Sequence, residues 1–440
     1  MTLEQKIKDK SVVTAIIGLG YVGLPLAHSI CQAGGHVLGF DVVQDKVDQL
    51  NKGESYLDTM PGHLVKENRD KGLFEATTDF DRLQETDVIV ICVPTPITKY
   101  KEPNLLYVLN SAEEIAKRLN KEQLVILEST TYPGTLKDEV IPVLEQHSGL
   151  NAGKDFYTAF SPEREDPGNP DFSTSGIPKI VGADTELERD LATDYYRNFL
   201  QTVIPVASSG TAEAIKLTEN IFRAVNIALV NELKVIYAKM GIDIWDVIEG
   251  AKTKPFGYMP FYPGPGLGGH CIPIDPFYLS WKAKEVDTPT RFIELAGEIN
   301  SRMPHYVCDE VSQILNREKS LAVNGAKILV LGVSYKKNIN DQRESPAFPI
   351  IDTLQKWGGE VSYYDPHISE ITSLREYPHI VGMKSVEDYV QGAKDSDLVL
   401  LLTDHDQLPY DEIVAHSDLI VDTRNAFAVR GLVKPHIFKA

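Results

Sequence analysis

Short apolar runs divide the first part of the chain at regular intervals. Most are rich in β-branched side chains with little polar interruption, which predicts strands buried on both faces of a parallel sheet. The first run leads into three glycines between Gly18 and Gly23, and an amphipathic stretch over 24–33 then predicts a helix. The second run ends at Asp41. The runs lie at 12–17, 36–40, 87–93 and 124–129.

The last part of the chain repeats this order with a different first turn. Its predicted strands lie at 326–331, 397–402 and 418–422. Gly18 and Gly34 are 16 residues apart, whereas the corresponding Gly332 and Gly358 are 26 apart, so the second copy carries ten extra residues in its first crossover. It also lacks the second and third glycines of the first copy.

The extra residues of the second copy are rich in charge. Two interpretations fit them: a nucleotide-binding turn rebuilt to present cations, or a solvated charged loop. Composition alone favours neither. The segment includes Lys336, Lys337, Asp341, Gln342 and Arg343.

Two long helical patterns lie between the halves. Residues 211–240 contain no Gly or Pro and have apolar residues at helical spacing, and a second pattern covers 288–317. The chain is therefore predicted to be an α/β protein with two Rossmann-like, doubly wound parallel-sheet domains joined by a long-helix central region. The predicted domains are 1–205, 206–318 and 319–440, and the long helices predict a homodimer or a higher homo-oligomer.

Composition narrows the partners and the compartment. The chain has 440 residues, 42% of them hydrophobic and 24% charged, with a net charge of −19. An acidic surface repels phosphate backbones and anionic lipid, so neither nucleic acid nor a membrane is an expected partner. The four cysteines form no CxxC pair, which argues against a disulfide framework or a zinc cluster, and no metal site is expected. With no signal-peptide pattern, the expected location is the cytoplasm.

The glycines after the first strand predict a dinucleotide site. Gly18 permits the tight turn, Gly20 lets the backbone approach a pyrophosphate, and Gly23 lets the helix pack on the strand. Asp41, 18 residues past Gly23, can accept hydrogen bonds from a ribose diol and would repel a 2′-phosphate, so we expect NAD rather than NADP. A glycine turn that only packs a helix, and hydroxyls that only cap strand ends, are the simpler alternatives. The residues expected at the cofactor are Gly18, Gly20, Tyr21, Val22, Gly23, Asp41, Pro94, Thr95 and Thr130.

A glycine-rich linker carries the candidate nucleophile. Four glycines within six residues can wrap backbone around a small ligand, and Cys271 follows them with Asp275 four residues later. A helix that starts near Pro273 would favour the thiolate form of Cys271. His270 is expected to be structural, because neighbours in an extended segment point to opposite faces. The four glycines are Gly264, Gly266, Gly268 and Gly269; the other cysteines, Cys31, Cys92 and Cys308, are expected to be inert core residues.

The first long helix carries an unusual polar stripe. Lys216, Asn220 and Arg223 fall at i, i+4 and i+7 and so share one face. They either line a site or form a hydrated helix face, and the apolar remainder of the helix favours a site. A Rossmann cofactor with an activated cysteine also permits oxidation of an alcohol beyond the aldehyde, to an acid.

Taken together, these motifs resemble the nucleotide-sugar 6-dehydrogenases, the UDP-glucose/UDP-N-acetylhexosamine/GDP-mannose dehydrogenase family, over nearly the whole chain. The family architecture implies an NAD domain, a central helical dimerisation region and a carboxyl-terminal UDP-binding domain. The matching pieces are Gly18-Leu-Gly-Tyr-Val-Gly, Val93-Pro-Thr-Pro, Ser129-Thr130, Ser161-Pro-Glu163, Lys216 with Asn220, Gly268-Gly-His-Cys271 with Asp275, and Lys336 with Asp341-Gln-Arg343-Glu-Ser-Pro.

The resemblance also implies roles. Cys271 would form the thiohemiacetal and thioester, and Lys216 with Asn220 would stabilise the oxyanion. Asp275 and Thr130 would orient the water or base, and Glu163 matches a family glutamate of the same proton chemistry. Arg343 and Lys336 would bridge cofactor and sugar nucleotide. The expected substrate-binding residues are Glu163, Lys216, Asn220, Arg223, Gly264, Gly266, Gly268, Gly269 and Lys336.

The cysteine segment indicates a branch of the family. It reads Gly-Gly-His-Cys-Ile-Pro-Ile-Asp, whereas the UDP-glucose branch usually reads Gly-Gly-Ser-Cys-Phe-Pro-Lys-Asp. The chain therefore resembles the enzymes that oxidise UDP-N-acetylglucosamine or its epimers, and we expect four-electron oxidation of C6 to the uronate for surface polysaccharides. The alternatives are a UDP-glucose 6-dehydrogenase, a two-electron 3-hydroxyacid dehydrogenase of similar architecture, which would not need Cys271, and a non-enzymatic NAD or UDP sensor.

Overall fold

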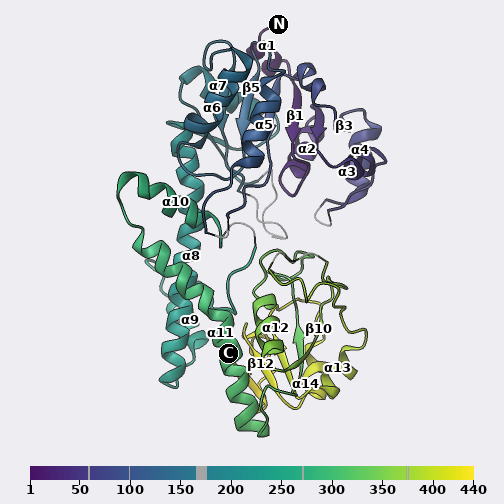
Figure 1. Cartoon of the computed structure of the whole chain (residues 1–440), viewed down its shortest axis with the longest axis vertical. Helices are drawn as coiled ribbons and strands as arrows, with labels where there is room; N and C mark the ends of the chain where they lie inside the picture. Colours follow the sequence, from purple (N-terminus) through teal and green to yellow (C-terminus); the bar gives the residue numbers. More distant parts are fainter. Residues whose placement is uncertain (58–59, 99, 165–175, 270–271, 373, 375) are drawn as a thin grey trace. The chain divides into compact units, whose positions relative to one another are not determined.

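The computed structural model describes residues 1–440 except 58–59, 99, 165–175, 270–271, 373 and 375 (Figure 1). The chain divides into two units, each with its own sheet. The first unit contains Met1–Glu219 and Phe277–Pro289, and the second contains Asn220–Pro276 and Thr290–Ala440.

The first unit is built on an eight-stranded sheet with the order β3-β2-β1-β4-β5-β6-β7-β8. All neighbours are parallel except β6 and β7, which pair antiparallel through Phe160 and Gly182. The strands are β1 (Val13–Ile17), β2 (His36–Phe40), β3 (Phe74–Thr77), β4 (Val88–Ile91), β5 (Leu124–Leu127), β6 (Tyr157–Phe160), β7 (Lys179–Gly182) and β8 (Val203–Val206).

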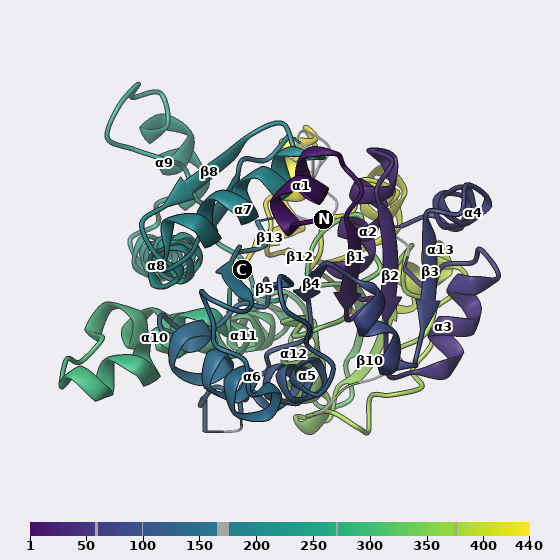
Figure 2. The same cartoon turned by 90° about the horizontal axis from the view of Figure 1, so that it is seen from above.

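Helices cover both faces of this sheet. One core lies beneath α1, α2 and α7, and the other lies beneath α5 and α6, on the opposite side of the sheet in Figure 2. Apolar side chains of β1 alternate between the two cores, as expected for a strand buried on both faces. The helices of this unit are α1 (Leu3–Lys8), α2 (Gly23–Gln32), α3 (Gln44–Asn51), α4 (Gly62–Asp70), η1 (Phe80–Glu85), α5 (Leu106–Ala116), η2 (Leu136–Val140), α6 (Ile141–Ser148), α7 (Glu186–Arg197) and η3 (Lys284–Val286).

The second unit contains a five-stranded, all-parallel sheet with the order β10-β9-β11-β12-β13. Its two faces are again covered, one by α11 and α12 and the other by α13, α14 and α15. The strands are β9 (Lys327–Leu331), β10 (Glu360–Tyr364), β11 (Leu398–Leu401), β12 (Ile420–Asp422) and β13 (Ile437–Lys439). The helices are α9 (Ile244–Ala251), α11 (Arg291–Lys319), α12 (Ala347–Lys356), α13 (Tyr389–Asp395), α14 (Tyr410–His416) and α15 (Ala426–Val429).

Two helices have residues in both units. Helix α8 (Ser209–Lys239) begins in the first unit and ends in the second, and α10 (Asp275–Ala283) begins in the second and continues in the first. The predicted helix over 211–240 is therefore confirmed as α8. The helix expected near Pro273 begins two residues later, at Asp275.

The predicted fold class is confirmed, because both halves are doubly wound sheets with helices on each face. Two strands end earlier than their apolar runs: β4 ends at Ile91 and β5 at Leu127. The last residues of the runs, Cys92 and Val93 after β4 and Glu128 and Ser129 after β5, already belong to the loops. No helix among the described residues is both long enough and apolar enough to cross a membrane.

Candidate active site

The glycine turn after β1 is closed where the helix packs and open at its centre. Gly18 has a φ of +94°, and a Cβ there would lie 2.8 Å from the Cys92 carbonyl oxygen. At Gly23 an added Cβ would lie only 2.0 Å from the Gly18 carbonyl oxygen, so helix and strand touch through these glycines. At Gly20 an added Cβ would meet nothing within 4 Å. This opening is where a backbone can approach a pyrophosphate.

The residues around the turn fit the adenosine half of NAD. Val22 precedes α2 without a side-chain cap, so the amino end of this helix keeps its capacity for an anion. The Asp41 carboxylate accepts hydrogen bonds from the Leu19 amide (3.3 Å) and the Val43 amide (3.0 Å), which holds it beside the turn. Tyr21 is half-buried against the core. The arrangement places one carboxylate and one helix terminus where a ribose and a pyrophosphate would need them.

The loops after β4 and β5 are joined by a hydroxyl. Ser129 donates to the Val93 carbonyl oxygen (2.7 Å), so the segment with Pro94 and Thr95 lies beside the segment with Thr130. Pro94 is exposed and Thr130 is partly exposed, but Thr95 is buried. The structure therefore brings these predicted cofactor residues together at the carboxyl ends of two neighbouring strands.

Helix α10 is attached to one of these loops. The buried Tyr278 hydroxyl donates to the Thr95 carbonyl oxygen. The same helix begins with Asp275, four residues after Cys271 in the chain. Cys271 and His270 lie outside the described residues.

Lys216 and Glu163 are in direct contact. The Lys216 ammonium is buried and donates to the Glu163 carbonyl oxygen at 2.5 Å. The Glu163 carboxylate accepts from the Lys179 ammonium (3.2 Å) and from the Arg164 amide (2.8 Å). Sequence reasoning missed Lys179, although a lone lysine at the start of an apolar strand is a signal of a buried partner.

Asn220 and Asp275 form a buried pair. The Asn220 amide donates to the Asp275 carboxylate at 2.5 Å, and both residues are buried. Helix α8 therefore contributes Lys216 to the first unit and Asn220 to the second. Arg223 shares their face of the helix by spacing, but it is exposed, whereas Lys216 and Asn220 are buried.

The glycine linker packs against the charged segment of the second unit. The Gly269 amide donates to the Arg343 carbonyl oxygen (3.2 Å), and a Cβ at Gly268 would lie 2.6 Å from the Cβ of Tyr335. At Gly266, which has a φ of +146°, an added Cβ would meet Pro346 at 2.9 Å. Gly266 and Gly268 thus lie too close to their neighbours to carry a side chain.

The other end of the linker is fixed by two polar side chains. The Gly264 amide donates to the Asn231 side-chain oxygen (3.0 Å), and a Cβ at Gly264 would lie 2.5 Å from the Arg424 guanidinium. Burial lowers the pKa of Arg424, whose Nε donates to the Leu402 carbonyl oxygen. Sequence reasoning missed Arg424, although it follows a predicted strand and could have been sought by the same strand-end argument.

The charged insertion is only partly a solvated loop. Arg343 is exposed and its guanidinium bonds to the buried Asp341 carboxylate at 2.6 Å. Lys337 is exposed and pairs with Asp406 (3.4 Å). Lys336, which precedes Lys337 in the chain, is half-buried. The segment is therefore ordered by its own ion pairs while its backbone packs on the glycine linker.

The cysteines expected to be inert are buried. Burial raises the pKa of Cys31 and of Cys308 to about 12, and burial raises the pKa of Cys92 well above its ordinary value. None of these three has the environment of a nucleophile. Among the described residues, no group of three or more His, Cys, Asp or Glu side chains is arranged to hold a metal ion.

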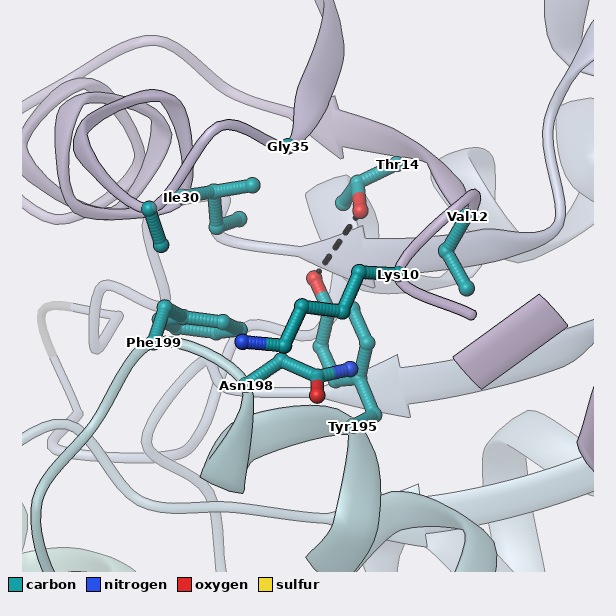
Figure 3. Close-up of a pocket in the computed structure, with 9 residues that line it drawn as sticks. Lys10, Val12, Thr14, Ile30, Gly35, Tyr195, Asn198 and Phe199 are labelled. Atoms are coloured by element: carbon teal, nitrogen blue, oxygen red, sulfur yellow. Dashed lines mark hydrogen bonds between the residues drawn. The ribbon is translucent and has the colours of Figure 1, made fainter. Parts of the chain in front are cut away.

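A small cavity of about 30 Å³ lies elsewhere in the first unit (Figure 3). Its wall includes Thr14, whose hydroxyl bonds to the Tyr195 hydroxyl (3.1 Å), with Asn198 and Phe199 from the end of α7 and beyond. Thr14 is near the amino end of β1, whereas the glycine turn follows the carboxyl end. The cavity is therefore separate from the cofactor residues and is too small for a nucleotide.

Comparison with known proteins agrees with this geometry. Models of the UDP-glucose/GDP-mannose dehydrogenase family match its NAD binding domain to residues 12–200, its central domain to 210–302 and its UDP binding domain to 329–429. A UDP-N-acetyl-D-glucosamine 6-dehydrogenase of Pseudomonas aeruginosa is 35% identical over 400 residues, 90% of this chain and 92% of that protein. A UDP-N-acetyl-D-mannosamine dehydrogenase of Methanococcus maripaludis is 36% identical over 89% of this chain and 86% of its own.

A solved structure of a UDP-D-ManNAc dehydrogenase from Pyrococcus horikoshii superposes with a TM-score of 0.86 at 29% identity, covering 97% of this chain and 98% of that one. The matches extend over all three family domains and include the NAD-binding one. The chain therefore belongs to the UDP-glucose/GDP-mannose dehydrogenase family, the NAD-dependent nucleotide-sugar 6-dehydrogenases.

Proposed function

We propose that this protein oxidises the C6 hydroxyl of a UDP-N-acetylhexosamine, with UDP-N-acetylglucosamine as the first candidate, to the corresponding uronate. The single observation that carries the proposal is the buried Asn220–Asp275 pair, whose aspartate lies four residues after Cys271 in the chain. A two-electron dehydrogenase needs no thiol and no carboxylate next to it, whereas hydrolysis of a thioester uses both. The relatives that act on UDP-N-acetyl-D-glucosamine and UDP-N-acetyl-D-mannosamine support the N-acetylated substrate class.

Each residue has a proposed part in the chemistry. The glycine turn and Asp41 would hold NAD, which would supply the hydride acceptor for two successive oxidations. The C6 hydroxyl gives up its proton to a base and the C6 carbon gives up a hydride, which leaves an aldehyde. The Cys271 thiolate adds to that carbon, and loss of a second hydride leaves a thioester. Water then forms the new C–O bond as the C–S bond breaks, which returns the thiolate and releases the carboxylate.

The polar residues would stabilise charge and move protons. Lys216 and Asn220 are donors suited to the alkoxide and oxyanion. Asp275, held by Asn220, and Thr130 would orient the water or the base, and Glu163 would take part in the same proton transfers. The sugar nucleotide would be held by the glycines at 264–269 with Lys336 and Arg343, and by Arg223.

We also propose a homodimer or a higher homo-oligomer in the cytoplasm. Helix α8 exposes apolar side chains seven residues apart, Phe222, Leu229 and Ile236, which form one stripe along the helix. A second copy of the chain would cover such a stripe. Domains 1–205, 206–318 and 319–440, which would fold as an NAD domain, a dimerisation region and a UDP-sugar domain, remain part of this proposal.

Counting NADH tests the proposal. UDP-N-acetylglucosamine, its galacto and manno epimers and UDP-glucose are offered separately, and NADH absorbance is compared with the sugar consumed. We expect two NADH per sugar with an N-acetylated substrate. One NADH per sugar would support the 3-hydroxyacid alternative, a preference for UDP-glucose would overturn the substrate assignment, and binding without turnover would indicate a sensor.

The covalent step has its own test. Cys271→Ser should still bind NAD and the UDP-sugar, measured by calorimetry, but should form no uronate. Cys308→Ser is the matched control, because Cys308 is buried in the core of the second unit. Uronate formation at the normal rate by Cys271→Ser would contradict the covalent intermediate.

A further inference from the structure

The first unit contains a buried cluster of one cation and two carboxylates. Lys179, the first residue of β7, is 6% exposed. Its ammonium lies 3.1 Å from a carboxylate oxygen of Glu128 and 3.2 Å from one of Glu163. Burial alone would lower the pKa of Lys179, but the two carboxylates outweigh burial and raise it.

The reversed strand explains why these residues meet. Glu128 follows β5 and Glu163 follows β6, and both strands point the same way. Strand β7 runs in the opposite direction and pairs with β6 through Phe160 and Gly182. Continuing this register past the end of β6 places position 163 opposite position 179. The amino end of β7 therefore lies at the carboxyl ends of β5 and β6, the edge at which ligands bind in such sheets.

Glu128 closes the buried side of the cluster. Its Oε1 accepts from the Tyr196 hydroxyl, and its Oε2 lies 4.0 Å from the Cys92 sulfur. Glu128 is 1% exposed, and burial raises its pKa. Its partners from β7, α7 and the end of β4 leave it facing the interior. A buried lysine without such a carboxylate would be strongly unfavourable.

Glu163 forms the open side of the same cluster. Its side chain is 17% exposed, its Oε1 accepts from the Arg164 amide, and its carbonyl accepts from Lys216. The Arg164 guanidinium is directed elsewhere, to Glu219 at 2.6 Å. The ionisable groups of the described residues that face Glu163 include Lys179, Lys216 and, behind Lys179, Glu128 with Cys92 and Tyr196.

We propose that Lys179, backed by Glu128, is a positioning residue that fixes the Glu163 carboxylate and keeps it ionised for proton transfer at the sugar. The inference rests on the proposed function only for the role of Glu163. Lys216 fixes the backbone of Glu163 and Lys179 fixes its carboxylate, so the two lysines have separate tasks. Without Lys179, Glu163 would share its surroundings with a second carboxylate, which favours uptake of a proton.

Kinetics of paired variants test the proposal. In Lys179→Met we expect kcat at neutral pH to fall about tenfold or more, with KM for the UDP-sugar changed less than about threefold, and the acidic limb of the kcat profile to move up by about one pH unit. Lys179→Arg keeps the cation and should recover most of kcat. In a Glu163→Gln background, Lys179→Met should cost less than about threefold, because its target is gone.

Glu128→Gln is the matched control and guards against a misfolded Lys179 variant. This substitution keeps the shape of the side chain and the Lys179 cation but removes the Glu128 carboxylate. The acidic limb of the kcat profile should therefore stay in place or move to lower pH. Movement to higher pH, an equal loss from Lys179→Met with and without Glu163, or an unchanged kcat in Lys179→Met would each overturn the proposal.

A measurement without turnover separates this inference from the proposed function. Denaturant unfolding of Lys179→Met, Glu163→Gln and the double variant gives their coupling directly. Non-additive effects on the free energy of unfolding support the Lys179–Glu163 link even if no UDP-sugar is oxidised. The absence of oxidation would refute only the proposed function. Strictly additive effects would refute the link even in an active enzyme.

Discussion

Glu213 joins helix α8 to the loop that carries Thr130. Its side chain is fully buried, and its two carboxylate oxygens accept from the Gly134 amide (2.6 Å) and the Leu136 amide (2.9 Å). These amides lie at the beginning of the helical segment that follows the loop. The carboxylate therefore holds the start of that segment against α8, one turn before Lys216.

Replacing Glu213 by Gln should remove a pH dependence of stability. Burial raises the pKa of Glu213 to about 7, from an ordinary value of 4.5. A carboxyl with a raised pKa favours the folded state fully below the unfolded value, and this contribution is lost as pH rises through the folded value. The difference between the folded and unfolded pKa values corresponds to about 3 kcal/mol in the free energy of unfolding. About 2.5 kcal/mol of this contribution is lost between about pH 5 and about pH 8.5.

The fluorescence of Trp281 can follow this change locally. Its ring centroid lies 5.0 Å from that of Tyr132, which belongs to the loop held by Glu213. The other tryptophans are Trp245 and Trp357, both in the second unit, so a Trp245→Phe/Trp357→Phe background isolates the signal. Urea unfolding is then measured across the pH range for this background chain and for the same chain carrying Glu213→Gln.

We expect the chain with Glu213 to lose about 2–3 kcal/mol relative to Glu213→Gln between about pH 5 and about pH 8.5. Glu232→Gln is the matched control, since it makes the same chemical change at an exposed position of α8. Its stability should keep the pH dependence of the parent chain. If Glu213→Gln and the parent vary with pH in parallel, the carboxylate is not the group that titrates.

Four further substitutions test cofactor binding, folding and catalysis separately. Gly20→Ala should raise KM for NAD about tenfold with an unchanged thermal midpoint, because its Cβ has open space, whereas Gly23→Ala should lower the free energy of unfolding by about 1–3 kcal/mol, because its Cβ would lie 2.0 Å from a backbone oxygen. Asp41→Asn should raise KM for NAD about tenfold and weaken the discrimination against NADP, which steady-state kinetics with both cofactors would measure. Asn220→Asp would place a second carboxylate against Asp275 in a buried position, so kcat at neutral pH should fall about 100-fold and recover partly as the pH is lowered. A pH-independent loss would contradict this last expectation.

Local patterns in the sequence were sufficient for the glycine turn and for part of α8. Gly18, Gly20 and Gly23 lie in one turn, and Lys216 and Asn220 lie in one helix, as their spacing predicted. Spacing gives the face of a helix, however, and not what covers it. Arg223 lies on the predicted face but is exposed, because spacing does not tell whether another element packs against that position.

Several strands of the first sheet could not be anticipated from their patterns. Strands β3, β6, β7 and β8 have four residues each, as β4 and β5 do, but each of them contains a polar residue, a glycine or a proline that interrupts its apolar run. Phe74–Thr77 and Val203–Val206 also have exposed positions that weaken the apolar signal. Their place follows from pairing with neighbours far along the chain, which no local window contains.

Glu128, Lys179 and Glu213, which support the candidate chemistry, were missed for the same physical reason, whereas Glu163 was predicted. Glu128, Glu163 and Lys179 are 35 and 16 residues apart, and only the order β5-β6-β7 with one reversed strand brings their charges together. Glu213 meets Gly134 across 79 residues. A group that contacts substrate must be of a particular chemical type in a recognisable motif, whereas a group that fixes it only needs the right charge in the right place. Supporting residues are therefore found from the topology. Once the order of the sheet is known, a lysine at the first position of a reversed, buried strand identifies such a supporting residue.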